Sequence, residues 1–120
     1  MNIGFRKLDD VGVVYLSGDL NIYHVNEVKK ELFEAISNNE KIAIDASRIS
    51  EVDSSGIQLL LSAKIESESK NKVLKIINHS PPLIKVIDLM GLVGFFGDKL
   101  KIPVNERNNY SLKYGIKKRK

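Results

Sequence analysis

The segment IDASRISEVDSSGIQLLL, residues 44–61, changes character twice along its length. It opens with an apolar run typical of a strand and closes with a dense apolar run typical of a helix. The residues between them are acids and serines, and the last of these, Asp53-Ser54-Ser55-Gly56, fall where the helix would begin. This order predicts a strand–loop–helix unit with polar side chains at the helix N-terminus.

Runs of β-branched residues elsewhere in the chain predict further strands. VGVVYLSGDL (11–20), KIAIDAS (41–47) and KVLKIIN (72–78) each have the length and composition of a strand. We expect residues 2–10 to pair with the first of them as the arm of a hairpin. The Gly-punctuated apolar segment 91–102 is expected to end in a short edge strand.

Helical periodicity separates these strands. Residues 25–38 have apolar positions three and four apart, and a third helix is expected to begin at Pro81-Pro82. In the helix after Gly56, the apolar stripe is read as Ile57, Leu60, Leu61 and Ile65. Alternating strands and helices predict a single α/β domain over residues 1–103, with a four- to five-stranded mixed sheet and helices packed against it.

Composition excludes several functional classes. Apolar residues make up 42% of the 120 residues and charged residues 28%, which is ordinary for a soluble globular domain. The longest apolar runs fall far short of the ~20 residues that cross a bilayer, and no signal-peptide core is visible. The chain has no Cys, so disulfides and thiolate metal sites are excluded. We expect a cytoplasmic protein without a cofactor.

The net charge of +4 is unevenly distributed. Residues 104–120 contain six basic residues and one acidic residue, a balance of +5, whereas residues 1–103 have a balance of −1. The segment 104–120 has too little apolar content for a core and reads as a basic, flexible tail. Its KKRK end is a weak signal for nucleic-acid binding, because no groove-reading motif or stacking platform precedes it.

The serines at the start of the second helix allow two interpretations. Ser55 and Gln58 have the spacing of a capping box, so the polar residues could serve only as helix caps. A cap needs one side chain, however, and three candidates stand in a row, which leaves a hydroxyl available. Gly56 beside an exposed serine would also let a partner's backbone or a phosphate approach closely.

A catalytic role for these serines is disfavoured. Nucleophilic catalysis requires a base within hydrogen-bond reach and an oxyanion hole. The only histidines are His24 and His79, both expected to be solvated, and no G-x-S-x-G elbow is present. The carboxylates show no metal-ligand spacing. We therefore expect a protein that is not an enzyme and has no metal site.

Three motifs in the same chain resemble a known family. SGDLN (17–21), the segment 44–61 and SPPLIKVIDLMGLVGFF (80–96) together resemble the STAS domain of bacterial anti-sigma-factor antagonists. Each motif is weak alone, whereas their joint order is specific, and the resemblance covers about residues 3–102. The family commonly has Asp at the position of Asn21, so this chain departs from the pattern there.

The resemblance implies a phosphorylation switch. In the family the serine after the Asp is phosphorylated, and that residue is Ser54 here. The unphosphorylated domain binds a GHKL-type serine kinase that is also an anti-sigma factor; phosphate abolishes binding, and a PP2C-type phosphatase restores it. The expected partner-binding residues are Asp19, Asn21, Asp53, Ser54, Ser55 and Gly56.

The resemblance also leaves other roles open. STAS domains occur as non-switched subunits or scaffolds in chemotaxis, stress-signalling and lipid-transport ABC complexes. In either case we expect a monomer or weak dimer that binds proteins, spans no membrane and makes no direct contact with nucleic acid.

The tail interpretation gives a first testable prediction. Deleting residues 108–120 should leave the melting temperature nearly unchanged, because a tail outside the core contributes little to the free energy of unfolding. Thermal unfolding of the full chain and the truncated chain checks this. Loss of cooperative unfolding in the truncated chain would show instead that Tyr110, Leu112 and Tyr114 pack on the domain.

Overall fold

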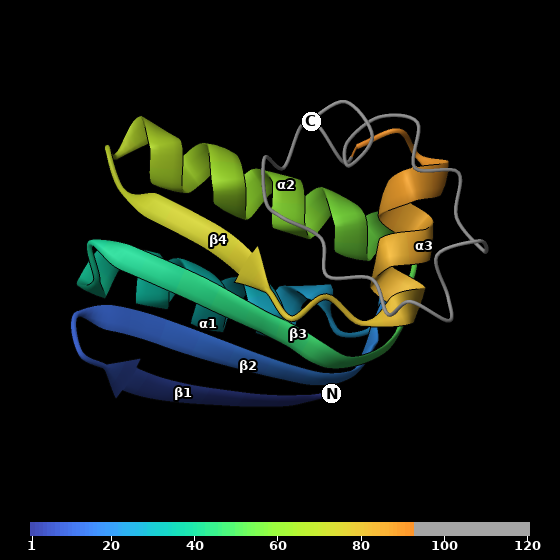
Figure 1. The fold of residues 1–120 in the computed structure, drawn as a ribbon, viewed down its shortest axis with the longest axis horizontal. Coiled ribbons are helices and arrows are strands. Elements are labelled where there is room, and N and C mark those ends of the chain that lie inside the picture. Colours follow the sequence, from blue (N-terminus) through green and yellow to red (C-terminus); the bar gives the residue numbers. More distant parts are fainter. Residues whose placement is uncertain (93–120) are drawn as a thin grey trace, which may run out of the picture.

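The computed structural model describes residues 1–92 of the chain, which form an α/β arrangement (Figure 1). The predicted edge strand within residues 91–102, the boundary at residue 103 and the basic tail lie beyond this range. The elements in chain order are β1 (Asn2–Leu8), β2 (Val11–Leu20), α1 (Val25–Asn38), β3 (Lys41–Val52), α2 (Ser54–Ser69), β4 (Val73–Ile77) and α3 (Pro81–Leu89).

Within residues 1–92 the sheet has four strands in the order β1-β2-β3-β4. β1 and β2 form the predicted antiparallel hairpin, turned at Asp9, whose φ of 55° is left-handed. β2 pairs with β3 and β3 with β4 in parallel, and the crossover helices α1 and α2 make these parallel pairs possible. The prediction of a single α/β domain with a mixed sheet is therefore confirmed.

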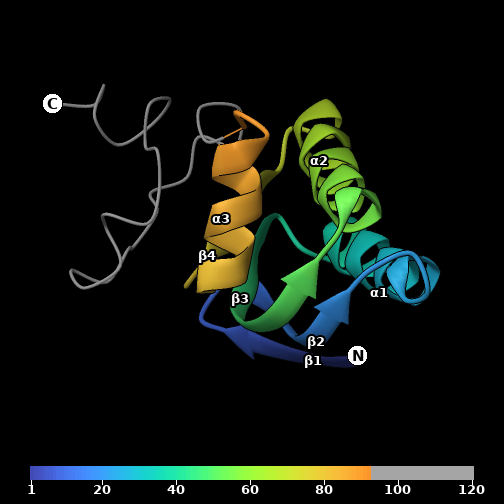
Figure 2. The ribbon, with the colours of Figure 1, turned by 90° about the vertical axis from the view of Figure 1, so that its right-hand side faces the viewer.

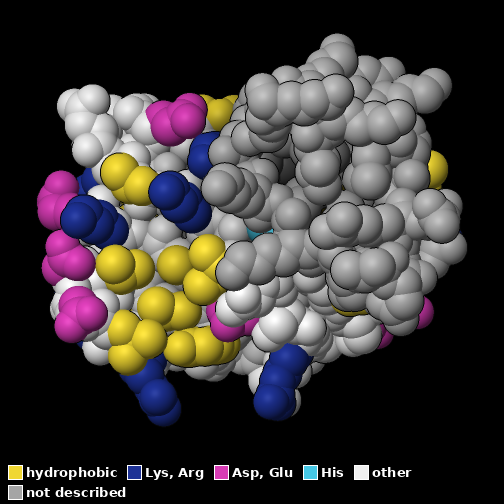
Figure 3. Space-filling model, in the orientation of Figure 1, with side chains coloured by type: hydrophobic (Ala, Val, Ile, Leu, Met, Phe, Trp, Pro, Cys, Tyr) yellow, Lys and Arg dark blue, Asp and Glu magenta, His cyan; other side chains and the backbone are white. Residues whose placement is uncertain are grey.

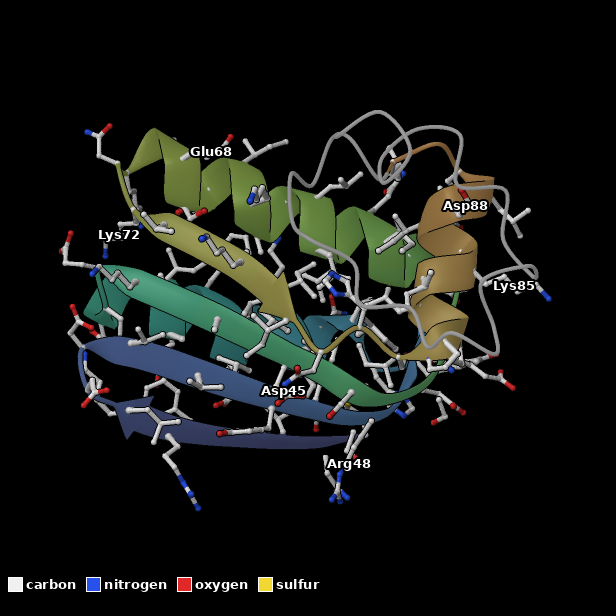
Figure 4. The ribbon with its side chains drawn as sticks, in the orientation of Figure 1. Asp45, Arg48, Glu68, Lys72, Lys85 and Asp88 are labelled. Carbon is white, nitrogen blue, oxygen red and sulfur yellow. The ribbon has the colours of Figure 1, made fainter. Side chains whose placement is uncertain are left out.

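The third strand is longer than its sequence suggests. It was expected to end at Ser47, yet β3 continues to Val52. Its register against β2 shifts twice, and the pairing still reaches Leu20 opposite Val52. The polar residues that resembled a loop remain in the sheet because their backbone stays paired with β2. Asp45, labelled in Figure 4, accepts local hydrogen bonds from the backbone and hydroxyl of Ser47, at 3.0 and 2.7 Å.

Helices α1 and α2 lie together on one side of the sheet (Figure 2). α3 stands at the end of the sheet toward which β4 points, where it contacts β3 (Figure 1). The core between the sheet and the helices is aliphatic. Its largest fully buried side chains are Leu16, Leu20, Leu32, Ile36, Ile42, Ile44, Ile49, Ile57, Leu60, Leu74 and Ile76.

The face of the sheet away from the helices has a mainly apolar row of side chains at one end. The register places Leu8, Val11, Lys41 and Val73 in one row across the four strands. This row alternates with Ile42 and Leu74, which face the helices, so it points away from them. Part of the same face appears in Figure 3 as hydrophobic side chains bordered by Lys, Arg, Asp and Glu.

The buried face of α2 differs from the predicted stripe. Ile57 and Leu60 are fully buried as expected, but Leu61 is only partly buried and Ile65 is 57% exposed. The buried face continues through Ala63 instead, because α2 packs against both the sheet and α1. Apolar residues on several sides of this helix made the periodicity ambiguous.

Gly56 sets how closely α2 packs on β2. A Cβ added at this glycine would lie 2.4 Å from the carbonyl oxygen of Leu20 and 2.8 Å from Cγ2 of Val52. Both contacts are shorter than real Cβ contacts, and the backbone oxygen cannot move without shifting the end of β2. Gly56 is itself buried, and the close approach that it permits within the fold is that of α2 to β2.

His79 is buried rather than solvated. It lies between β4 and α3, it is 6% exposed, and neither ring nitrogen has a hydrogen-bond partner among residues 1–92. Its neighbour Ser80 caps α3 by accepting from the amide of Leu83 at 3.4 Å. Burial lowers the pKa of His79 from 6.5 to about 4, because the protonated ring would lose its hydration.

This burial predicts a pH-dependent stability. Between the folded pKa of about 4 and the unfolded value of 6.5, only the unfolded chain binds the proton at His79. The free energy of unfolding should therefore fall as pH is lowered through this window, by at most about 1.4 kcal/mol per pH unit. Denaturant titrations from pH 7.5 to 4 should show a shallower loss of the free energy of unfolding in His79→Gln than in the unsubstituted chain. Equal slopes in His79→Gln and the unsubstituted chain would contradict this.

The contact at Gly56 gives a matched pair of substitutions. Gly56→Ala should destabilise the protein by about 1–3 kcal/mol, as overpacking of a core does. Gly4→Ala is the control, because a Cβ at Gly4 would meet Tyr15 at an ordinary 3.7 Å. Chemical denaturation measures both variants. A Gly56→Ala protein no less stable than Gly4→Ala would show that α2 can move away from β2 at little cost.

Candidate partner-binding site at the mouth of helix α2

Asp53 is the N-cap of α2. Its backbone is extended, with φ of −108° and ψ of −175°, and its Oδ1 accepts a hydrogen bond from the amide of Gly56 at 3.0 Å. This is the usual N-cap geometry, in which the side chain satisfies an amide three residues on. The predicted capping box of Ser55 and Gln58 is therefore wrong: the helix begins at Ser54, and Ser55 is already inside its first turn.

The second carboxylate oxygen of Asp53 reaches a different loop. Oδ2 accepts from the amide of Ile22 at 3.1 Å, and the amide of Asp53 donates to the carbonyl of Leu20 at 3.3 Å. Ile22 lies in the turn between β2 and α1, thirty-one residues away in sequence. One side chain thus joins the end of β2 and the turn after it (residues 19–24) to the start of α2 (residues 53–56). We call these two segments together the helix mouth.

The β2–α1 turn is held by its own polar groups as well. Asn21 accepts from the amide of Tyr23 through Oδ1 at 3.0 Å, and its carbonyl accepts from the amides of His24 and Val25 at 2.9 and 3.0 Å. Nδ1 of His24 lies 2.8 Å from the carbonyl oxygen of Asp19. Asn21 thus holds the turn through its own side chain and carbonyl.

The residues at the mouth differ in accessibility. Ser54 is exposed, whereas Asp53 and Ser55 are partly buried and Gly56 is buried. Ser54 is the first residue of α2, and the capping interaction belongs to Asp53, so the Ser54 hydroxyl is not needed for the cap. Of the two serines, Ser54 offers the more accessible hydroxyl.

Acidic residues lie at and beside the helix mouth. Asp19 and Glu51 are opposite each other in the register of β2 and β3, and Asp53 is two residues beyond Glu51. Among residues 1–92 no group of three or more His, Asp or Glu side chains is arranged to hold a metal ion. No helix in the same range is long and apolar enough to cross a bilayer.

Two exposed apolar residues of the helix mouth were not identified from the sequence. Ile22 is 62% exposed and Tyr23 is 88% exposed, although both belong to a turn held by several hydrogen bonds. The available signal was a pair of large apolar residues directly after the polar GDLN, in a turn that needs no apolar side chain. Together with Ser54 they form the exposed surface of the mouth.

Solved structures with the same fold include several regulators. An anti-sigma factor antagonist from Mycobacterium paratuberculosis superimposes with a TM-score of 0.74 at 20% identity, over 84% of this chain and 86% of its own. SpoIIAA in its unphosphorylated form gives 0.66 at 24% identity, over 90% and 96%. The phosphorylated form of the Bacillus SpoIIAA gives 0.64 at 24% identity, over 90% and 97%. These likenesses establish a SpoIIAA-like fold.

The sequence itself assigns the family. Residues 3–100 match the family described as Mlab, STAS domain, which is most of the chain and includes every element described above except Asn2 at the start of β1. The resemblance seen in the GDLN turn, the DSSG segment and the third helix is thereby confirmed. The chain belongs to the STAS domain family.

Proposed function

We propose that this STAS domain is a phosphorylation-switched binding protein of the anti-sigma-factor-antagonist kind. With Ser54 unphosphorylated, the helix mouth binds a GHKL-type serine kinase that also acts as an anti-sigma factor. Phosphorylation of Ser54 by that kinase abolishes binding, and a PP2C-type phosphatase restores it. These proteins would meet in the cytoplasm. The observation that supports the switch best is the exposed Ser54 hydroxyl beside a cap made by Asp53.

Phosphorylation at this position would leave the fold intact. A phosphate adds about −1.5 to −2 charges, and the N-terminus of a helix favours an anion. The cap on Gly56 does not use the Ser54 hydroxyl, and the core residue Ile57 lies a turn away on the buried face. The modification would act on the surface that the partner contacts, where the dianion also adds to the charges of Asp19 and Asp53.

The structural neighbours support this proposal because they include proteins of the proposed functional class. Several are anti-sigma factor antagonists, and one of them, SpoIIAA, has been solved in both the unphosphorylated and the phosphorylated form. Their likeness to this chain extends over 84% to 90% of its length.

A second candidate function is a fixed subunit rather than a switch. The STAS resemblance also allows a fixed subunit of a lipid-transport ABC complex, and the matched family is described as Mlab, STAS domain, without reference to anti-sigma factors. The same mouth would then bind its partner permanently. Purification with the bound partner separates the two candidates: a serine kinase indicates a switch, and an ABC ATPase indicates a fixed subunit.

Substitutions at the two serines test the switch. Ser54→Ala should fold normally, accept no phosphate from the kinase and bind it constitutively, whereas Ser54→Asp should fold and bind weakly. Ser55→Ala is the matched control and should still be phosphorylated. Because Asp53 makes the cap, Ser55→Ala should change the free energy of unfolding by less than about 0.5 kcal/mol, whereas Asp53→Ala should cost about 0.5–2 kcal/mol.

Phosphopeptide mapping after incubation with the kinase and ATP decides the assignment. Label on Ser54 alone supports the switch. Label on Ser55, or on neither serine, would overturn it and favour the fixed subunit.

A further inference from the structure

We propose that the C-terminal segment of this chain, residues 110–120, binds within the same molecule along the groove between β1 and α1, beside the free edge of the sheet. The apolar side chains of the segment cover the floor of the groove, and its basic end meets acidic side chains of α1. This inference goes beyond the proposed function, because it involves neither Ser54 nor the protein that the helix mouth binds.

The edge strand β1 is the first observation. Within residues 1–92 it pairs with β2 alone, so the backbone amides and carbonyls of its outer edge have no partner strand (Figure 1). All of its residues except Ile3 are exposed. A free edge of this kind favours pairing with another extended segment, and natural proteins commonly block it. A segment that runs beside β1 would supply the missing partner.

The groove beside this edge is the second observation. It has a volume of about 420 Å³, and its apolar floor is formed by Ile3, Phe5, Val14 and Ala35. Phe5 is opposite the buried Val14 in the strand register, so its ring points toward the helix side of the sheet. The ring is nevertheless 55% exposed, because α1 does not cover β1. The groove therefore offers apolar area that the side chains of an added segment can bury.

A stripe of glutamates on α1 is the third observation. Glu27, Glu31 and Glu34 are four and three residues apart, so they lie along one face of the helix, and the last two line the groove. All three are exposed, and none of their side chains makes an ion pair or hydrogen bond within residues 1–92. Like charges at this spacing destabilise a helix. A basic segment in the groove would relieve their repulsion.

The sequence of the C-terminal segment complements the groove in both respects. Its apolar residues occupy every second position, at Tyr110, Leu112, Tyr114 and Ile116. Such alternation is typical of a strand with one apolar face. The next four residues, KKRK at 117–120, are all basic, whereas the charged residues that line the groove are glutamates. One apolar face is too little for a core but is enough to cover the floor of a groove.

The chain is long enough for this contact. Residues 93–109 separate the described residues from the segment, and a chain of that length spans up to about 55 Å. The longest dimension of the structure is 39 Å. Because the segment is tethered to the domain, its effective concentration at the groove is high. The contact lies outside the core and its charge pairs are exposed, so deletion of residues 108–120 is still expected to change the melting temperature little.

The test is paramagnetic broadening of amide resonances in the full chain. The chain has no Cys, so Ser111→Cys gives a single site for a nitroxide spin label. In the isotope-labelled protein that carries this label, we expect the amide resonances of Phe5 and Glu31 to lose intensity, because both residues line the groove. The amide resonance of Leu89 at the end of α3 should stay sharp.

Two pairs of substitutions test the charge and the apolar contact separately. Glu31→Lys should abolish the broadening at Phe5, whereas Glu68→Lys makes the same change of charge at an exposed position of α2 and should leave it unchanged. Phe5→Ser should reduce the broadening at Glu31, whereas Leu8→Ser, on the other face of β1, should not. Raising the salt concentration from about 50 to 500 mM should weaken the broadening, because salt screens the exposed charges.

Mixing two forms of the chain identifies the molecule whose segment occupies the groove. Spin-labelled chain without isotopes is added to isotope-labelled chain without the spin label, and the Phe5 and Glu31 resonances should stay sharp. Broadening in this mixture as strong as in the doubly labelled chain would show that a second copy occupies the groove, and would overturn the proposal. No broadening at Phe5 and Glu31, even broadening over the whole domain, or broadening that survives both Glu31→Lys and Phe5→Ser would also overturn it.

Discussion

The carboxylate of Asp53 is the interaction on which the helix mouth depends. One oxygen satisfies the amide of Gly56 in the first turn of α2, and the other satisfies the amide of Ile22 in the turn after β2. A helix N-terminus needs such an acceptor because its first amides have no partner within the helix. By using both oxygens, a single residue caps the helix and fixes the neighbouring loop against it.

Close packing beneath the carboxylate makes this geometry possible. Gly56 lets α2 approach the carbonyl of Leu20, and the long β3 keeps its pairing with β2 as far as Val52. The end of β2 and the start of α2 are therefore held together both by backbone contact and by Asp53. A surface that must recognise a partner in one state and reject it in another benefits from a rigid base, because the change can then be confined to one exposed group such as Ser54.

The sequence was sufficient for the architecture and for the family, since the order of elements and the three motifs are local patterns. It was insufficient for interactions between distant residues. The cap was assigned to Ser55 because the spacing to Gln58 fits a box, whereas the structure uses Asp53, whose second oxygen is engaged by Ile22. The sequence suggests that Gly56 lets a partner approach closely, because the carbonyl of Leu20 that packs against Gly56 is not visible in the sequence.

The other differences between prediction and structure have the same cause, because they too depend on contacts between residues that are distant in sequence. His79 resembled a solvated turn residue, because its position between β4 and α3 in the sequence gives no sign of the burial that it has in the folded chain. The polar half of β3 resembled a loop because its pairing with β2 joins residues that are distant in sequence, as does the hydrogen bond that Asp45 accepts from Asn78 at 3.1 Å. Ile22 and Tyr23 could have been flagged as unusual in a turn, but their exposure is known only from the folded chain.

Amide hydrogen exchange in the Asp53→Asn variant tests the central claim most directly. Asn is a good N-cap and can still accept from Gly56, but its second side-chain atom is a donor and cannot accept from Ile22. We predict that the Ile22 amide is protected in the unsubstituted chain and loses that protection in Asp53→Asn, while the Gly56 amide stays protected in both. An Ile22 amide that exchanges freely in the unsubstituted chain, or equally slowly in both proteins, would contradict the account.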